Sequence, residues 1–145
     1  ASCEFDVETL RPTYKLLIPL VNWYYLTLIK QGKKEEAQRI ANLIPPDADG
    51  NKKSNYYKLA MVYNGSVDIE DALADAEAFL AKDPENHMSS YPSNTYGLAW
   101  KLICDGQVQR GYEILKRGYD THGWALADTA IEFDMARWRE NGGVN

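Results

Sequence analysis

The sequence has few of the residues on which common site chemistries depend. It contains two cysteines and two histidines among 145 residues. Two cysteines are too few for a disulfide framework or a cysteine-based zinc site. Both histidines, His87 and His122, lie in predicted turns without a cysteine or carboxylate at metal-ligand spacing. No glycine-rich phosphate loop, nucleophile elbow or zinc-protease motif is present, so we expect a non-enzyme without metal or cofactor.

Long hydrophobic runs and excess positive charge are also missing. The most apolar stretch, residues 16–29, is 14 residues long and contains Pro19 and Asn22. It is too short to span a bilayer and predicts a core helix. The net charge of −5 argues against a nucleic-acid partner, which requires a positive surface. Residues 51–90 carry seven acidic and four basic side chains, so the excess negative charge lies mostly there.

What the sequence does contain is helical periodicity. Between turn-like breaks, apolar residues recur three and four positions apart, and no segment alternates with period two. Asp68 precedes residues 69–82 as a helix start, and Ser93 or Asn94 is placed to cap residues 95–104. These patterns predict an all-α chain of six or seven helices.

The middle of the chain also has a longer-range pattern. Counted from Lys53, large residues fall at relative positions 4, 7, 11 and 27, small ones at 8, 20 and 24, and a proline at 32: Tyr56, Leu59, Tyr63 and Phe79; Ala60, Ala72 and Ala76; Pro84. This segment resembles the tetratricopeptide repeat, a 34-residue helix–turn–helix unit. Small residues at positions 8 and 20 allow the two helices of a unit to approach closely.

Two further units fit the same spacing. With Ala37 at position 20, Val21, Tyr24, Tyr25 and Leu28 occupy positions 4, 7, 8 and 11, although Tyr25 replaces the usual small residue. With Gly111 at position 20, the same positions hold Thr95, Leu98, Ala99 and Leu102. The resemblance implies a single domain, an α-α superhelix of about three hairpins (residues 18–51, 53–86 and 92–125) with flanking N-terminal and C-terminal helices. Residues 124–140 are predicted to form the C-terminal capping helix.

The resemblance also implies a binding surface, because the first helices of such hairpins line a concave groove. The residues at groove-facing positions are Asn22, Trp23, Leu26, Tyr57, Lys58, Met61, Asn64, Tyr96 and Trp100. Rings and a methionine with a few polar groups suit an extended peptide or a partner's helix. The predicted function is a non-catalytic protein-interaction module, or adaptor, with a protein or peptide partner.

Three alternatives remain open. Several of these rings could instead pack beneath the N-terminal segment or the terminal helix. A small inhibitor or immunity-type protein could bind a basic partner through an acidic patch on the middle helix, composed of Asp68, Glu70, Asp71, Asp75 and Glu77. A helical hydrolase could use a carboxylate with His87 or His122.

The cysteines and the first residue bear on compartment. On the repeat layout, Cys3 and Cys104 lie at opposite ends and two units apart, which predicts two unpaired thiols, since a disulfide needs Cα atoms within about 7 Å. A start at Ala1 is typical of a processed protein or an excised fragment. We favour a processed, exported protein, periplasmic or secreted, with a cytoplasmic protein as the alternative.

Overall fold

The computed structural model describes residues 5–6, 11–12, 14–82, 90–121 and 126–140, and it confirms the all-α prediction. The chain divides into two compact units, residues 1–69 and 70–145, and each is described by itself. The elements in chain order are β1 (Phe5–Asp6), β2 (Arg11–Pro12), α1 (Tyr14–Lys30), α2 (Lys34–Ala41), α3 (Asn55–Tyr63), α4 (Ile69–Lys82), α5 (Ser90–Cys104), α6 (Val108–Thr121) and α7 (Leu126–Glu140).

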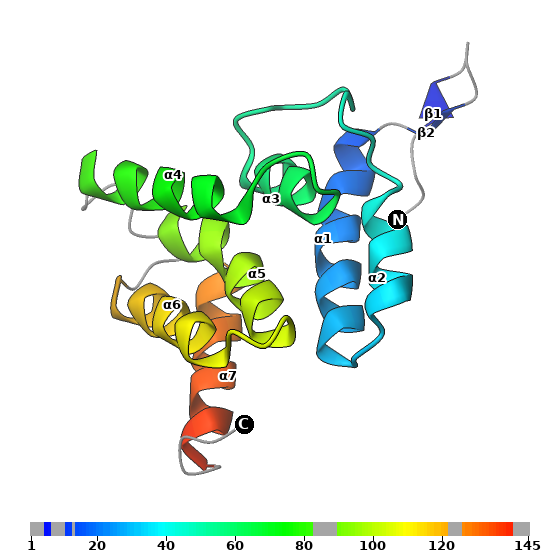
Figure 1. Cartoon of the computed structure of the whole chain (residues 1–145). Coiled ribbons are helices and arrows are strands. Elements are labelled where there is room, and N and C mark those ends of the chain that lie inside the picture. The colour runs from blue at the N-terminus through cyan, green and yellow to red at the C-terminus, as the bar shows by residue number, and fades with distance from the viewer. Residues whose placement is uncertain (1–4, 7–10, 13, 83–89, 122–125, 141–145) are drawn as a thin grey trace. The chain divides into compact units, whose positions relative to one another are not determined.

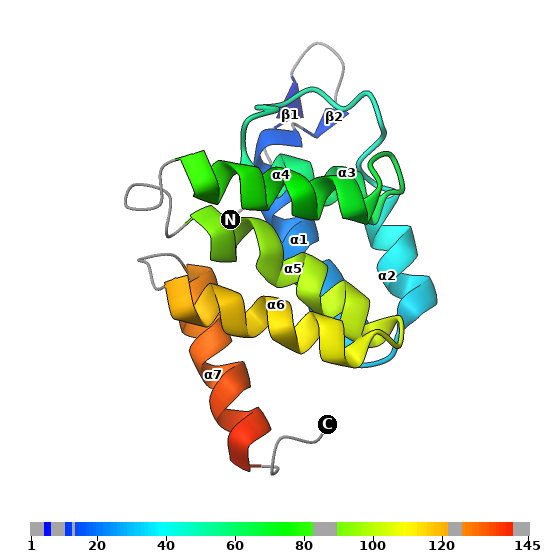
Figure 2. The ribbon, with the colours of Figure 1, turned by 60° about the vertical axis from the view of Figure 1, so that its left-hand side comes forward.

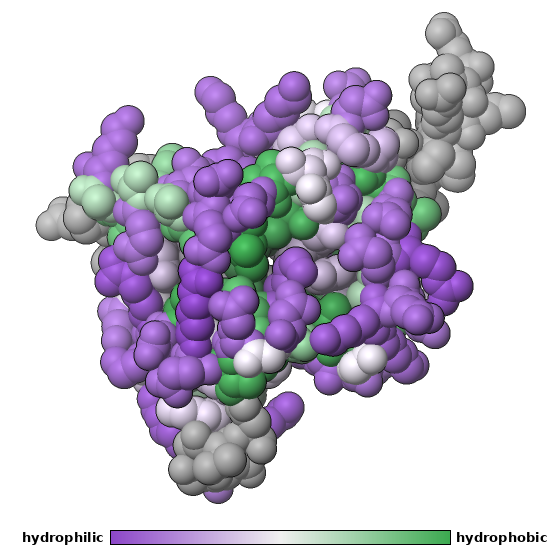
Figure 3. Space-filling view, viewed as in Figure 1, coloured by the Kyte–Doolittle hydropathy of each residue, from purple (hydrophilic) through white to green (hydrophobic). Residues whose placement is uncertain are grey.

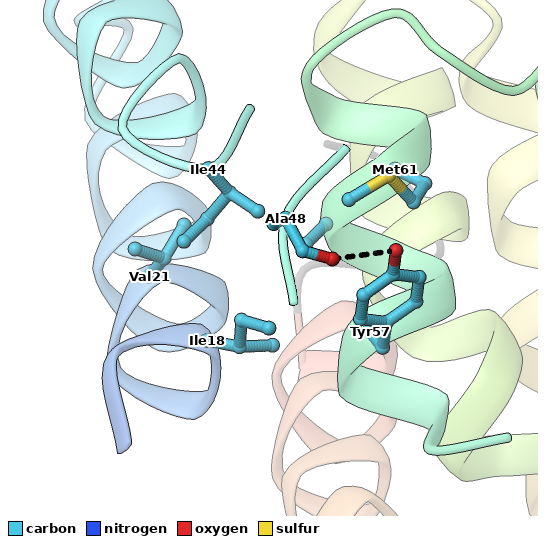
Figure 4. Close-up of a cluster of buried hydrophobic side chains, with 7 residues drawn as sticks. Ile18, Val21, Ile44, Ala48, Tyr57 and Met61 are labelled. Carbon is cyan, nitrogen blue, oxygen red and sulfur yellow. Dashed lines mark hydrogen bonds between the residues drawn. The ribbon is translucent and has the colours of Figure 1, made fainter. Parts of the chain in front are cut away.

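In the first unit, α1 and α2 form a helical hairpin, and α3 packs against both (Figure 1). Gly32 forms the turn, with a φ of 78° that L-residues with a side chain rarely adopt. The core lies among α1, α3 and the segment after α2, where Ile44 and Ala48 are buried against Ile18 and Tyr57 (Figure 4). Residues 45–54 form no helix or strand, but they contribute Ala48 to the core.

In the second unit, α5 and α6 form the central hairpin, and α7 packs against both. Figures 1 and 2 show α5 between α4 and α6. The close approach predicted at Ala99 and Gly111 is present. Ala99 is fully buried, and a Cβ atom on Gly111 would lie 2.7 Å from its carbonyl oxygen and 2.4 Å from Ile103 Cγ1.

Two helix predictions need correction. The sequence predicts a flanking N-terminal helix, but Phe5–Asp6 and Arg11–Pro12 pair as an antiparallel two-residue ladder. Pro12 lacks a backbone N–H and is tolerated at such an edge. Ser93 and Asn94 do not cap α5, because that helix begins at Ser90. The backbone N–H groups in the first turn of a helix have no acceptor within the helix, so Pro92, which lacks an N–H, is accommodated there.

Other boundaries match their predictions. Helix α4 begins directly after Asp68 and ends at Lys82, and α7 falls within the predicted capping segment. The three helical hairpins and the single domain remain predictions, because α3 and the main part of α4 belong to different units.

Gly111→Ala tests the close approach between α5 and α6. The new Cβ atom would meet a backbone oxygen that cannot move aside, so we expect a loss of about 1–3 kcal/mol in the free energy of unfolding. Gly118→Ala in the same helix is the matched control, because its Cβ atom would lie 3.0 Å from the flexible end of Ile131 and at an ordinary contact distance of 3.8 Å from Pro92. Urea denaturation of both variants measures the difference, and equal losses would contradict the account.

Candidate functional site

Residues predicted for the groove in the first hairpin serve mainly the fold of the first unit. Asn22 is 2% exposed, and its Oδ1 accepts a 2.7 Å hydrogen bond from the hydroxyl of Tyr63. The Tyr63 ring stacks on the Tyr25 ring with centroids 4.0 Å apart. Tyr25 is therefore accommodated at the position where the repeat pattern usually has a small residue. Leu26 is also buried. These side chains offer little surface to a partner.

The second hairpin's residues are similarly engaged. Tyr57 and Met61 belong to the core, and the Tyr57 hydroxyl donates to the carbonyl oxygen of Ala48 at 3.1 Å (Figure 4). Asn64 is half-buried, and its amide donates to the carbonyl oxygen of Ile44 at 2.8 Å. Lys58 is half-buried. Tyr57→Ala would therefore disrupt the core and cannot report on a groove.

Trp23 is the ring that the first hairpin supplies to the predicted groove. It is half-buried, and its indole nitrogen donates to the hydroxyl of Tyr56 at 3.3 Å. Its neighbours Leu20 and Tyr24 are 55% and 52% exposed. Leu20 and Tyr24 lie one helical turn apart, so they occupy one face of α1. We call Leu20, Trp23 and Tyr24 the α1 apolar face.

The groove prediction missed Leu20 and Tyr24. A signal for them was present, because α1 carries no charged residue between Leu16 and Ile29. Apolar side chains therefore surround the helix, while only part of its circumference can pack against α2 and α3. The repeat pattern instead directed attention to Trp23 and to residues that the fold uses internally.

In the second unit, Tyr96 and Trp100 both bind one carboxylate of α7. The Tyr96 hydroxyl donates to Asp134 Oδ2 at 2.7 Å, and the Trp100 indole nitrogen donates to the same oxygen at 2.9 Å. Burial, and then the Asp134 carboxylate, raise the pKa of Tyr96 above its ordinary value. The packing of these two side chains against the terminal helix agrees with the alternative noted for such rings.

A layer of aromatic rings continues this contact. Tyr112 of α6 stacks on Trp138 of α7 with centroids 5.1 Å apart, and its ring meets Trp100 edge-on at 6.4 Å. Burial, followed by the nearby Asp134 and Cys104, raises the pKa of Tyr112. These contacts fix α7 on α5 and α6 through rings that also carry polar atoms.

Asp134→Ala tests whether this carboxylate holds the second unit together. Removing it leaves the buried Tyr96 hydroxyl and the Trp100 indole without this acceptor, so we expect a loss of about 1–3 kcal/mol in stability. The loss should be smaller in a Tyr96→Phe background, where one of the two hydrogen bonds to Asp134 is already absent. A double-mutant cycle by chemical denaturation measures this coupling, and an additive result would contradict it.

The acidic patch on α4 is partly neutralised within the second unit. Arg110 contacts both carboxylate oxygens of Glu70 at 2.5 Å, and Arg117 contacts those of Glu77 at 2.6 and 2.7 Å. The two pairs are seven residues apart on each helix, so α4 and α6 run parallel. Strongly hydrophilic side chains cover the region between these helices in Figure 3. Asp68, Asp71 and Asp75 are exposed.

Tyr91 of α5 joins the second of these pairs. The Arg117 guanidinium lies 5.4 Å from the centroid of the Tyr91 ring, and Tyr91 adds a smaller contribution to the lowered pKa of Glu77. Burial, and then the Glu77 charge, raise the pKa of Tyr91. The hydrogen bond from Arg117 lowers the pKa of Glu77 below its ordinary value of 4.5.

The lowered pKa of Glu77 predicts an acid-dependent loss of stability. A carboxyl group whose pKa is lower in the folded state stabilises the fold above its ordinary pKa, and the contribution is lost as the pH falls through the folded value. Because the Glu77 side chain is 45% exposed, solvent screening limits the effect to about 1 kcal/mol or less. Glu77→Gln should be less stable than wild type at pH 7 and should approach it well below pH 4.5.

The control for this pH effect removes the partner cation. In an Arg117→Gln background, Glu77→Gln should show little pH-dependent difference in urea denaturation. A difference that persists unchanged in acid would contradict the assignment to this ion pair.

The histidines and cysteines are the remaining candidate residues. His87, His122 and Cys3 lie outside the described residues, and Cys104 is half-buried at the end of α5. Within the described ranges, no group of three or more His, Cys, Asp or Glu residues is arranged to hold a metal ion. Among the helices described, none is both long enough and apolar enough to cross a membrane.

Comparisons of this chain with protein families, with curated proteins and with solved structures found no match.

Proposed function

We propose that this protein is a non-catalytic protein-interaction module that binds a peptide or a helix of its partner on the α1 apolar face. The observation that carries the proposal is the exposure of Leu20 and Tyr24, each more than half accessible, on a helix without charge from Leu16 to Ile29. Large apolar side chains that gather on one exposed face are typical of protein-binding surfaces.

The chemistry of this face suits a protein ligand. Leu20 offers aliphatic surface, while Trp23 and Tyr24 offer rings with few rotatable bonds, and such rings are enriched among residues that dominate binding energy. Thr27 lies on the next turn and donates to the carbonyl oxygen of Trp23 at 2.9 Å. An apolar side chain of a partner helix could therefore pack against Leu20 and Tyr24 while polar groups surround the contact.

The groove across all three hairpins is the broader form of this proposal, and Trp23 belongs to both. The α1 apolar face has the stronger support, because Asn22, Leu26, Tyr57, Met61 and Tyr96 are buried. Inhibition through the acidic patch has less support, because arginines of α6 already bind Glu70 and Glu77. The hydrolase alternative depends on histidines outside the described residues.

Leu20→Ser combined with Tyr24→Ser tests the α1 apolar face. Partner capture from the native host should fall at least roughly tenfold, because the substitutions remove apolar contact area from the interface. Both side chains are exposed, so the free energy of unfolding should change by no more than about 0.5 kcal/mol for each substitution.

Phe133→Ser is the matched control for this experiment. Phe133 is 70% exposed on α7, so its replacement removes an exposed ring outside the proposed face. Capture by this variant should equal that of wild type. Undiminished capture by the Leu20/Tyr24 double variant would overturn the proposed binding face.

A further inference from the structure

Helix α4 buries little of its surface. Of its 14 residues, Ala76 and Leu80 are buried, and they form a small cluster with Tyr91 of α5. The contrast with α5 is large, because Tyr91, Pro92, Thr95–Ala99 and Leu102 are all buried there. A helix with a narrow buried stripe gains less from packing than one buried on most sides.

Charge contributes much of the specificity with which α4 meets α6. The Glu70–Arg110 and Glu77–Arg117 pairs place two carboxylates over two guanidinium groups in the same register, two helical turns apart. All four side chains are 40–57% exposed. Exposed ion pairs contribute little binding free energy, but they discriminate between partners and fix the register in which two helices meet.

The chain before α4 is also exposed. Gly65 has a φ of 85°, and residues 65–68 are all exposed to solvent. The boundary between the two compact units falls directly after Ile69, the first residue of the helix. Release of α4 would therefore break the small cluster of Ala76, Leu80 and Tyr91 and the two ion pairs, while the chain at residues 65–68 has no buried contacts to lose.

From these observations we infer that α4 is a dissociable helix, and that the α5–α6 surface beneath it binds an acidic helix of a partner protein. Arg110 and Arg117 require two carboxylates seven residues apart, and Tyr91 requires small and aliphatic side chains near the second carboxylate. Helix α4 meets both requirements with Glu70, Glu77, Ala76 and Leu80. A partner helix with the same pattern would replace α4 on this surface.

The probe for this site is a labelled synthetic peptide with the sequence of residues 69–82, added to the full-length protein. The matched control peptide carries the substitutions E70R and E77R. Wild-type protein should bind the native peptide roughly tenfold more tightly than the control, as expected for two exposed ion pairs. Protein carrying R110E and R117E should show the opposite preference, and 1 M salt should remove both preferences.

Hydrogen exchange of the wild-type protein tests dissociation without any substitution. Backbone amides of α4 should exchange at least about tenfold faster than those in the buried turns of α5. Equal protection of the two helices would overturn dissociation of α4. Failure of both peptides to bind, or binding without reversal of preference in the R110E/R117E protein, would overturn the acidic-helix site. Neither result bears on the α1 apolar face.

Discussion

The contact between α5 and α6 at Gly111 determines how the second unit is built. The absence of a side chain there allows α6 to approach the carbonyl oxygen of Ala99 more closely than a Cβ atom would permit. Residues on either side of Gly111 then point to different neighbours. Arg110 reaches Glu70 of α4, whereas Tyr112 stacks on Trp138 of α7. One small residue thereby sets the positions of an ionic contact and an aromatic contact.

The aromatic side chains explain why many residues predicted for binding hold the fold instead. A buried tyrosine or tryptophan needs a hydrogen-bond partner for its polar atom as well as packing for its ring. The Tyr57 hydroxyl donates to a backbone carbonyl oxygen, and the Tyr63 hydroxyl donates to Asn22. Tyr96 and Trp100 both donate to Asp134. The proposed binding face accordingly lies where apolar side chains without such a role, Leu20 above all, remain exposed.

Local sequence signals predicted the helices well because periodicity and small residues act over short distances. Asp68 preceded a helix with the predicted bounds, and Gly111 opposed Ala99 as the spacing required. The predicted start of α5 was too late because proline usually interrupts a helix, whereas Pro92 lies in the first turn of α5, where proline is tolerated. The pairing of Arg117 with Glu77, 40 residues earlier, has no local signal, since exposed charges carry no periodic constraint. The burial and hydrogen bonding of Tyr96 and Trp100 likewise depend on Asp134 of α7, which is distant in the sequence.

Site-specific photocrosslinking in the native host tests the central claim most directly. A photoreactive amino acid would replace Tyr24 in one variant, Trp100 in a second and Phe133 in a third, because these three residues are on α1, α5 and α7. The account predicts a discrete protein adduct from position 24 and none from position 133. An adduct from position 100 without one from position 24 would contradict the α1 apolar face and favour the concave groove.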